Sequence, residues 1–193
     1  MPKTETGALA RRDQILRSTV SLLLEVGLSA ATTRGVTQRA GVGTGLLNHY
    51  YRWPELRAAA WRAIFDAVAD DQFPTGQPPD HALEHYFETA FTPDARQYWQ
   101  LWIEAVELAA HDEAMAGALR DAQARLHNGL AGTLRAGCDA NHWRLADPGA
   151  TALRLGALYD GLAGLLISGA AQLDAEEAEA HLRAAFQREC DDE

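Results

Sequence analysis

Cysteine is scarce in this 193-residue chain, which contains only Cys138 and Cys190. Two thiols so far apart in the sequence form neither the closely spaced ligand pairs of a zinc site nor the framework of a disulfide-rich domain. We therefore expect two reduced thiols, and we predict no metal site and no cofactor.

A signal peptide and a membrane span are also missing from the sequence pattern. The N-terminal stretch MPKTETGALARR has no apolar core. The most apolar segment, Leu155–Ile167, is shorter than a bilayer requires and contains Asp160. These features predict a cytoplasmic protein without membrane association.

The sequence lacks the motifs of several large enzyme classes. It has no Gly-rich phosphate loop, no dinucleotide fingerprint and no Ser-His-Asp order. Runs of β-branched residues are few, whereas the helix formers Ala, Leu, Arg and Glu are abundant. With 47% apolar residues to build a core, the chain is predicted to be all-α, as one domain or two small ones.

The segment Thr32–Leu56, TTRGVTQRAGVGTGLLNHYYRWPEL, predicts two short helices around a tight turn. Thr32 can cap the first helix through its hydroxyl, and Gly41–Gly43 can reverse the chain at little steric cost. The second helix is expected from Thr44 to about Tyr51, with Leu47 facing inward. A helix-turn-helix of this kind places its second helix in the major groove of DNA.

Charge is divided unevenly along the chain, although the total is acidic at −10. Residues 1–62 carry nine basic and four acidic side chains, a net charge of +5, and the remaining 131 residues carry −15. Phosphate neutralisation supplies most non-specific DNA affinity, so the basic segment suits a duplex and the acidic segment is repelled by it. The charge pattern therefore supports DNA binding by the N-terminal segment.

About the first third of the chain resembles the DNA-binding domain of the tetracycline-repressor-like (TetR) family. The resemblance rests on the helix stop at Leu24–Leu28, Thr32 with Arg34, the turn at Ala40–Val42, and the recognition-helix pattern at Gly45–Tyr51. GLLNHYY is similar in particular to the branch that includes choline-sensing regulators of betaine synthesis. The resemblance implies a three-helix DNA-binding domain (1–53), a helical effector-binding and dimerisation domain (54–193), and a homodimer.

Three positions depart from the pattern of that family. Gly43 stands where the family commonly has Ser at the cap of the recognition helix, and Thr37 stands where it has a small Ala. Trp53-Pro54 replaces the basic residue that usually touches a phosphate. Arg52 or Arg57 is the candidate substitute for that contact.

The outward positions of the second helix, together with the resemblance, give the candidate DNA contacts. Side chains of the recognition helix read base edges, while arginine and hydroxyl groups around it hold phosphates. The candidates are Thr32, Arg34, Thr44, Gly45, Leu46, Asn48, His49, Tyr50 and Arg52.

Most of the remaining chain is predicted to be helical. Helices are expected over Arg11–Val26, Pro54–Asp71, Asp80–Phe91, Asp94–Ala110 and Glu113–Ala136. The Pro- and Gly-rich segment 73–79 is the clearest linker signal. Asp147-Pro148 opens a further helix that Gly169 closes, and Asp174 with Glu177 forms a capping box for the last helix, which runs to about Glu189.

The helix between Pro148 and Gly169 has an apolar surface wider than one chain needs. From residue 150 to 169 its only charges are Arg154 and Asp160, and its leucines point to more than one side. It could be the central helix of a single-chain core. We favour a dimer interface in which this helix and the last one pair with their symmetry mates. The predicted interface residues are Leu158, Leu162, Leu165 and Leu166.

The segment His81-Ala82-Leu83-Glu84-His85 matches the H-x-x-E-H pattern of some zinc peptidases. It defines the alternative function, an all-helical metal-dependent enzyme that uses the His81-Glu84-His85 face. Such an enzyme needs a third ligand and a substrate cleft, and this motif lies at the start of a short helix. An ordinary solvated face and adventitious metal binding are the other interpretations, and we predict that the protein is not an enzyme.

Aromatic side chains are concentrated between Phe87 and Trp102. They either pack the core or wall an effector pocket of the kind found in the resembled family. Because indole faces attract cations and a carboxylate could add charge, a cationic effector is favoured. The predicted effector contacts are Phe87, Phe91, Trp99, Trp102 and Glu104. The polar stripe Gln100, Glu104, Glu107 and His111 either faces solvent or lines a cavity.

Together these features predict a homodimeric, all-helical, ligand-responsive transcription regulator. We expect it to bind double-stranded DNA as a repressor and to leave a palindromic operator when a small-molecule effector binds.

Overall fold

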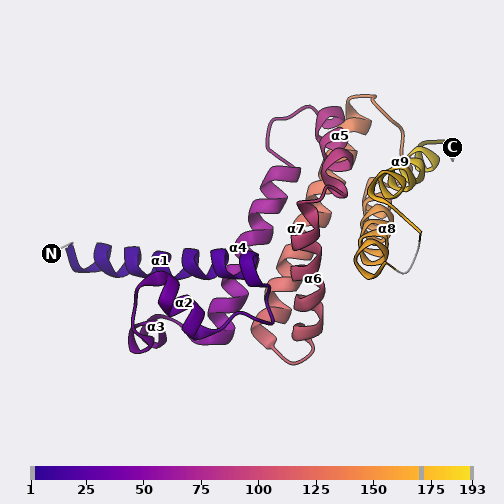
Figure 1. Cartoon of the computed structure of the whole chain (residues 1–193). Coiled ribbons are helices and arrows are strands. Elements are labelled where there is room, and N and C mark those ends of the chain that lie inside the picture. Colours follow the sequence, from indigo (N-terminus) through magenta and orange to yellow (C-terminus); the bar gives the residue numbers. More distant parts are fainter. Residues whose placement is uncertain (1–2, 170–171, 192–193) are drawn as a thin grey trace. The chain divides into compact units, whose positions relative to one another are not determined.

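The computed structural model of the chain describes residues 3–169 and 172–191, in which all regular secondary structure is helical (Figure 1). The all-α fold predicted from composition is confirmed. The nine helices of the described residues are α1 (Lys3–Val26), α2 (Thr33–Ala40), α3 (Thr44–Tyr50), α4 (Trp53–Gln72), α5 (Pro79–Ala90), α6 (Ala95–Ala109), α7 (Glu113–Asp139), α8 (Pro148–Ser168) and α9 (Ala175–Asp191).

Side-chain caps fix several helix ends where the sequence predicts them. The Thr32 hydroxyl accepts a hydrogen bond from the Gly35 N–H at the start of α2. Asp174 and Glu177 exchange backbone-to-carboxylate hydrogen bonds at the start of α9. The first helix is longer than expected, since it begins at Lys3; residues 3–10 contain no proline that would stop it.

The chain divides into two compact units. The first, which we call the head unit, consists of Met1–Phe65 and Gln100–Ala122. Within it α1 packs on α2 and α2 packs on α3. Ile15, Leu23 and Val36 are fully buried there, so one side of the first helix faces a core.

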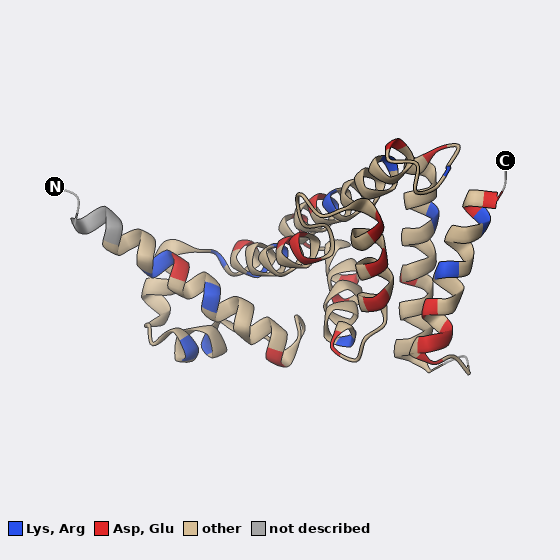
Figure 2. Ribbon diagram, turned by 90° about the horizontal axis from the view of Figure 1, so that it is seen from above, with Lys and Arg blue, Asp and Glu red and all other residues tan. Residues whose placement is uncertain are grey.

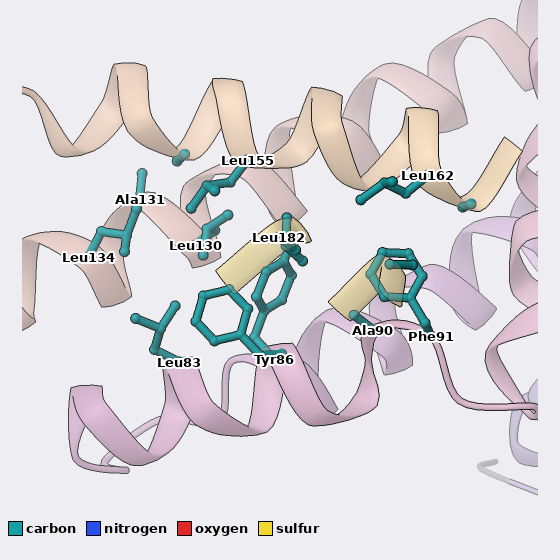
Figure 3. Close-up of a cluster of buried hydrophobic side chains, with 14 of the residues drawn as sticks. Leu83, Tyr86, Ala90, Phe91, Leu130, Ala131, Leu134, Leu155, Leu162 and Leu182 are labelled. Atoms are coloured by element: carbon teal, nitrogen blue, oxygen red, sulfur yellow. The ribbon is translucent and has the colours of Figure 1, made fainter. Parts of the chain in front are cut away.

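The second unit, the body unit, consists of Asp66–Trp99 and Gln123–Glu193. Its core is built from α5, α7, α8 and α9, whose side chains point toward one another in Figure 3. Tyr86 of α5, Leu134 of α7, Leu155 of α8 and Leu182 of α9 are all buried in this cluster.

The division between the units falls inside three helices. Residues 65 and 66 of α4, 99 and 100 of α6, and 122 and 123 of α7 belong to different units. The predicted domains, 1–53 and 54–193, divide the chain at a single point of the sequence, and that boundary stays a prediction.

Helix α8 is closed by the predicted caps at both ends. The Asp147 carboxylate accepts from the Gly149 and Ala150 N–H groups, and Gly169 ends the helix in the left-handed region with φ of 62°. By length and composition alone, this helix of 21 residues could cross a membrane, whereas the apolar segment Leu155–Ile167 considered in the sequence is too short to do so. One such helix carries little weight, because core helices of soluble proteins meet the same criterion.

Candidate DNA-binding and effector-binding sites

Helices α2 and α3 form the helix-turn-helix that the sequence predicts. Gly41 ends α2 with φ of 62°, a left-handed conformation that favours glycine. Its N–H bonds to the Gln38 carbonyl, and the Val42 N–H bonds to the Thr37 carbonyl at 3.1 Å. These bonds satisfy carbonyls at the end of α2 and redirect the chain into α3.

One face of α3 is buried and the opposite face is open. Leu47 is fully buried, as predicted, and Leu46 is 38% exposed. Four neighbouring candidates, Thr44, Gly45, Asn48 and His49, are exposed, and Tyr50 is half-buried with its ring edge-on to His49. The exposed face has the size and polarity expected of a groove-reading helix, and the individual base contacts stay predictions.

The Gly43 departure from the family pattern has a structural consequence. Gly43 is the N-cap of α3, and it provides no side-chain hydrogen bond to the first turn. A serine or asparagine cap stabilises a helix by only a few tenths of a kcal/mol more than a glycine cap does, about 0.3 kcal/mol. The absence of a capping side chain therefore costs α3 little, and the buried Leu47 anchors the helix to the head unit.

Arg34 and Arg52 are exposed beside α3, as phosphate contacts require, and Thr32 is exposed at the start of α2. Arg57, the other proposed substitute for the missing basic residue, is not available. Its Nη2 lies 2.8 Å from Asp112 Oδ2, and the two side chains are only 17% and 9% exposed. The proposal of Arg57 as a phosphate contact is therefore wrong, because a half-buried ion pair holds its guanidinium.

Arg12 is a residue near α3 that sequence reasoning missed. Its Nε donates to the Tyr51 hydroxyl at 3.2 Å, and its guanidinium carbon lies 5.2 Å from the centre of the Tyr51 ring. This contact brings an exposed cation from α1 to the end of the recognition helix. The two residues are 39 positions apart, and no local pattern links them.

The uneven charge distribution of the sequence is visible on the helices. In the ribbon of Figure 2, the positions of acidic residues outnumber those of basic residues on the helices toward the end marked C. Several acidic residues of the body unit are held in ion pairs, such as Asp66 and Asp70 with Arg125 and Glu189 with Arg154. These pairs reduce, without cancelling, the acidity of the body unit.

Four aromatic side chains of the body unit form one cluster, which we call the aromatic cluster: Tyr86, Phe91, Trp99 and Tyr159. The ring centres of Phe91 and Trp99 are 5.9 Å apart, and those of Phe91 and Tyr159 are 5.4 Å apart. The Trp99 indole N–H donates to the Tyr159 hydroxyl at 2.8 Å, and the Tyr86 ring lies 6.2 Å from that of Tyr159. The structure thus brings the predicted Phe91 and Trp99 together, with two tyrosines that the sequence did not indicate.

Asp160 adds a negative charge beside this cluster. Burial, together with the nearby charge of Asp160, raises the pKa of Tyr86 and raises that of Tyr159 to about 12. Although Asp160 is exposed by area, the surrounding protein desolvates its carboxylate and raises its pKa as well. Aromatic faces beside a poorly solvated carboxylate form an environment that suits an organic cation.

The other three predicted effector residues lie elsewhere. Phe87 packs on Phe186, and its ring faces the Arg183 guanidinium, whose carbon is 4.9 Å from the ring centre. Trp102 belongs to the head unit, where it contacts Trp61 and Phe65. Glu104 is also in the head unit, and its carboxylate accepts from the Leu28 N–H.

The predicted polar stripe, which runs along α6 and ends at His111 just after it, is not uniform in exposure. Gln100, Glu107 and His111 are exposed, which agrees with the solvent-facing interpretation, whereas Glu104 is half-buried.

Phe87, Trp102 and Glu104 each contact residues outside the group formed by Phe91 and Trp99, so they are not part of the proposed effector site.

The four leucines predicted for the dimer interface differ in accessibility. Leu162 is 6% exposed and packs in the core of the body unit (Figure 3). Leu158 and Leu166 are partly buried against that core. Leu165 is 40% exposed, and Leu153, which is not among the predicted interface residues, is 65% exposed. Leu162 is a core residue in the single chain, so the open apolar face of α8 contains Leu153 and Leu165 instead.

The His81-Glu84-His85 face does not form a metal site in the described part of the chain, where no group of three potential ligands converges. Both Glu84 oxygens accept from Arg183, at 2.6 and 2.8 Å, and this lowers the pKa of Glu84, whereas a general base needs a raised one. A groove of about 500 Å³ nearby includes Glu84 and neither histidine. The enzyme alternative is not supported by this geometry.

Comparisons with known families agree with these features. Residues 79–191 match the family described as BetI-type transcriptional repressor, C-terminal, and residues 15–52 match the bacterial regulatory proteins of the tetR family. A curated relative, the HTH-type transcriptional regulator BetI of Cronobacter sakazakii, is 29% identical over 172 residues, which is 84% of this chain and 81% of that protein.

Solved structures share the fold. A Rhodococcus sp. chain assigned to the TetR family superposes with a TM-score of 0.75 at 24% identity, covering 93% of this chain and 98% of that one. A transcriptional regulator from Saccharomonospora viridis, solved in complex with choline, has a TM-score of 0.75 at 21% identity, with 91% and 95% coverage.

Proposed function

Since the chain belongs to the TetR family of DNA-binding transcription regulators, with a BetI-type C-terminal domain, we propose that it is a repressor released by an organic cation. The observation that carries the DNA-binding part is the helix-turn-helix of α2 and α3, whose second helix presents one open face. The basic excess of residues 1–62 supports the same surface. The regulated DNA lies in the cytoplasm of a bacterium, and we infer the same location for the protein.

A symmetric dimer supports the proposed mode of binding. Two recognition helices related by a two-fold axis read half-sites about one helical turn apart, roughly 34–36 Å. The open face of α8 with Leu153 and Leu165 is a surface that a second copy can cover, together with α9. We therefore propose a palindromic operator and a dimer through the last two helices.

The proposed effector site is the aromatic cluster with Asp160. Four rings offer π faces and the carboxylate offers a negative charge, so the site favours choline or another small quaternary ammonium over an anion. The choline bound to the Saccharomonospora viridis structure supports the same ligand class. A ligand that inserts between Trp99 and Tyr159 has to replace their hydrogen bond. It releases DNA only if it binds a conformation that fits the operator poorly.

A selection from a randomised duplex library tests the DNA-binding assignment. The enriched sequence should be palindromic, and its affinity should fall steeply with salt. Arg34→Ala should weaken binding to every duplex and reduce the salt slope by about one, whereas Asn48→Ala should change preference at one or two positions. If neither variant alters binding, the recognition surface is assigned incorrectly.

A fluorescence titration with choline tests the effector site separately. Trp99→Phe and Tyr159→Phe should weaken choline binding and its release of the operator, while Trp102→Phe in the head unit is the matched control. If choline and related ammonium ions release the operator equally from all three variants, the pocket is not the aromatic cluster. If they have no effect on the wild type either, the ligand class is wrong.

A further inference from the structure

Helix α1 ends in a way that leaves one backbone group to be satisfied from elsewhere. Gly27 ends the helix with φ of 83°, and its N–H bonds to the Leu23 carbonyl at 2.9 Å. This single bond is that of the simpler αL motif, which leaves the next N–H without a partner in the helix, whereas the Schellman motif returns it to a helix carbonyl. Here the Leu28 N–H instead donates to Glu104 Oε2 of α6, at 2.5 Å.

The carboxylate of Glu104 fits closely over this turn. A Cβ atom at Gly27 would lie 3.2 Å from Glu104 Oε2 and 3.3 Å from Oε1. Two features of this position therefore favour glycine: the left-handed backbone conformation, and the close approach of the Glu104 carboxylate, which a side chain would crowd. The Leu28 side chain is 1% exposed, so the turn is anchored on its apolar side as well.

The element that carries Glu104 is itself fixed in the head unit. Three residues earlier on α6, the Leu101 carbonyl accepts from the indole N–H of Trp61, at 3.0 Å, and Trp61 is fully buried. Because α4 holds α6 at Leu101, Glu104 is a fixed acceptor against which the end of α1 is placed. Four residues after Leu28, Thr32 caps the start of α2, and the turn after α2 leads into the recognition helix.

A role in stability alone does not explain a carboxylate at this position. The C-terminal end of a helix carries partial negative charge, so an anion close to it is unfavourable. Within the described part of the chain, no ion pair compensates the Glu104 charge. A neutral acceptor would satisfy the Leu28 N–H at lower electrostatic cost, so what Glu104 contributes is the position of the acceptor.

We propose that Glu104 is a positioning residue for operator recognition, which sets the α1–α2 turn, and with it α3, through the Leu28 N–H. The proposal rests on DNA binding and is independent of the effector. Specific binding needs both recognition helices in register, whereas non-specific binding needs only the basic surface. Loss of the acceptor should therefore lower the affinity for the operator selectively.

Binding titrations with three variants test this role. Glu104→Ala should bind the operator about tenfold more weakly, with unchanged affinity for a scrambled duplex of equal length and an unchanged salt slope. Glu104→Gln retains an acceptor and should restore most of the operator affinity. Glu107→Ala, an exposed glutamate on the same helix, is the control and should bind as the wild type does.

Amide hydrogen exchange at Leu28 reports on the contact even if no operator is recovered. Exchange at Leu28 should be slow in the wild type and in Glu104→Gln, and faster in Glu104→Ala. Wild-type operator affinity in Glu104→Ala would overturn the proposal. It would also be overturned if Glu104→Gln loses as much affinity as Glu104→Ala, or if Leu28 exchanges at the same rate in all three proteins.

Discussion

The part-buried ion pair between Arg57 and Asp112 should contribute more to stability than an exposed ion pair between α4 and α7. Arg57 of α4 and Asp112, which precedes α7, are 17% and 9% exposed. Asp112 has a second role, because its Oδ1 accepts from the Met115 N–H at 3.0 Å and caps α7. Arg62 and Asp121 join α4 to α7 as well, at 2.7 Å, but they are 50% and 56% exposed.

Asparagine and alanine separate the two roles of Asp112. Removing one partner of a buried ion pair costs about 3–5 kcal/mol, because the other charge stays buried without compensation. Asp112→Asn keeps an acceptor for the cap and the pair is only part-buried, so we expect a loss between the buried and exposed cases, about 2 kcal/mol. Asp112→Ala also loses the cap and should cost roughly 1 kcal/mol more. Asp121→Asn, the matched control, should cost less than about 1 kcal/mol.

The pH dependence of the Asp112 contribution follows from its pKa. Burial acts to raise that pKa, but hydrogen bonds from Met115 and Arg57 and the Arg57 charge lower it below the ordinary 3.8. A lowered pKa means that the folded state binds the proton less readily than the unfolded chain does. The stability gap between wild type and Asp112→Asn should thus be constant near neutral pH and close as the pH falls below about 4.

Urea denaturation followed by tryptophan fluorescence measures these differences. The variants should be compared at one protein concentration, because dissociation of a dimer contributes to the apparent stability. If Asp112→Asn lies within 1 kcal/mol of Asp121→Asn, burial does not strengthen this pair and the reasoning fails. If the stability difference between wild type and Asp112→Asn grows as the pH falls, the lowered pKa of Asp112 is contradicted.

Three further predictions concern the body unit. Leu165→Arg should fold but remain monomeric, whereas Leu162→Arg should unfold the body unit. Light scattering measures the oligomeric state and circular dichroism the helix content, and a folded Leu162→Arg would contradict the placement of Leu162 in the core. The pKa of Tyr159 is raised to about 12, so its hydroxyl should stay protonated at pH 11, and absorbance at alkaline pH measures its ionisation. The stability that this protonated hydroxyl contributes should be lost only as the pH rises from about 10 through 12. Gly137→Ala should lower the free energy of unfolding by about 1–3 kcal/mol, because its Cβ would lie 1.8 Å from the Trp143 ring. Gly132→Ala on the same helix has open space around its Cβ and should raise the free energy of unfolding by up to about 1 kcal/mol; thermal melts compare the two.

Features set by neighbouring residues were predictable from the sequence. The Thr32 cap, the glycine turn at Gly41, and the Asp174–Glu177 capping box depend on residues two to four positions apart, and the structure has all three. The inward direction of Leu47 follows from helical periodicity in the same way. Local hydrogen bonding and helix geometry act over a few residues, so a single sequence contains the information.

Only the tertiary structure decided which distant residues meet. Trp99 meets Tyr159 across 60 positions, Arg57 meets Asp112 across 55, and Leu28 meets Glu104 across 76. A helical pattern shows that a leucine or glutamate lies on one side of its helix, but it does not show which element covers that side. For this reason Leu162 was assigned to a dimer surface and lies in a core, and Glu104 was assigned to an effector site and holds the end of α1. The sequence by itself determined the helices and their caps, whereas packing between helices decided the role of each side chain.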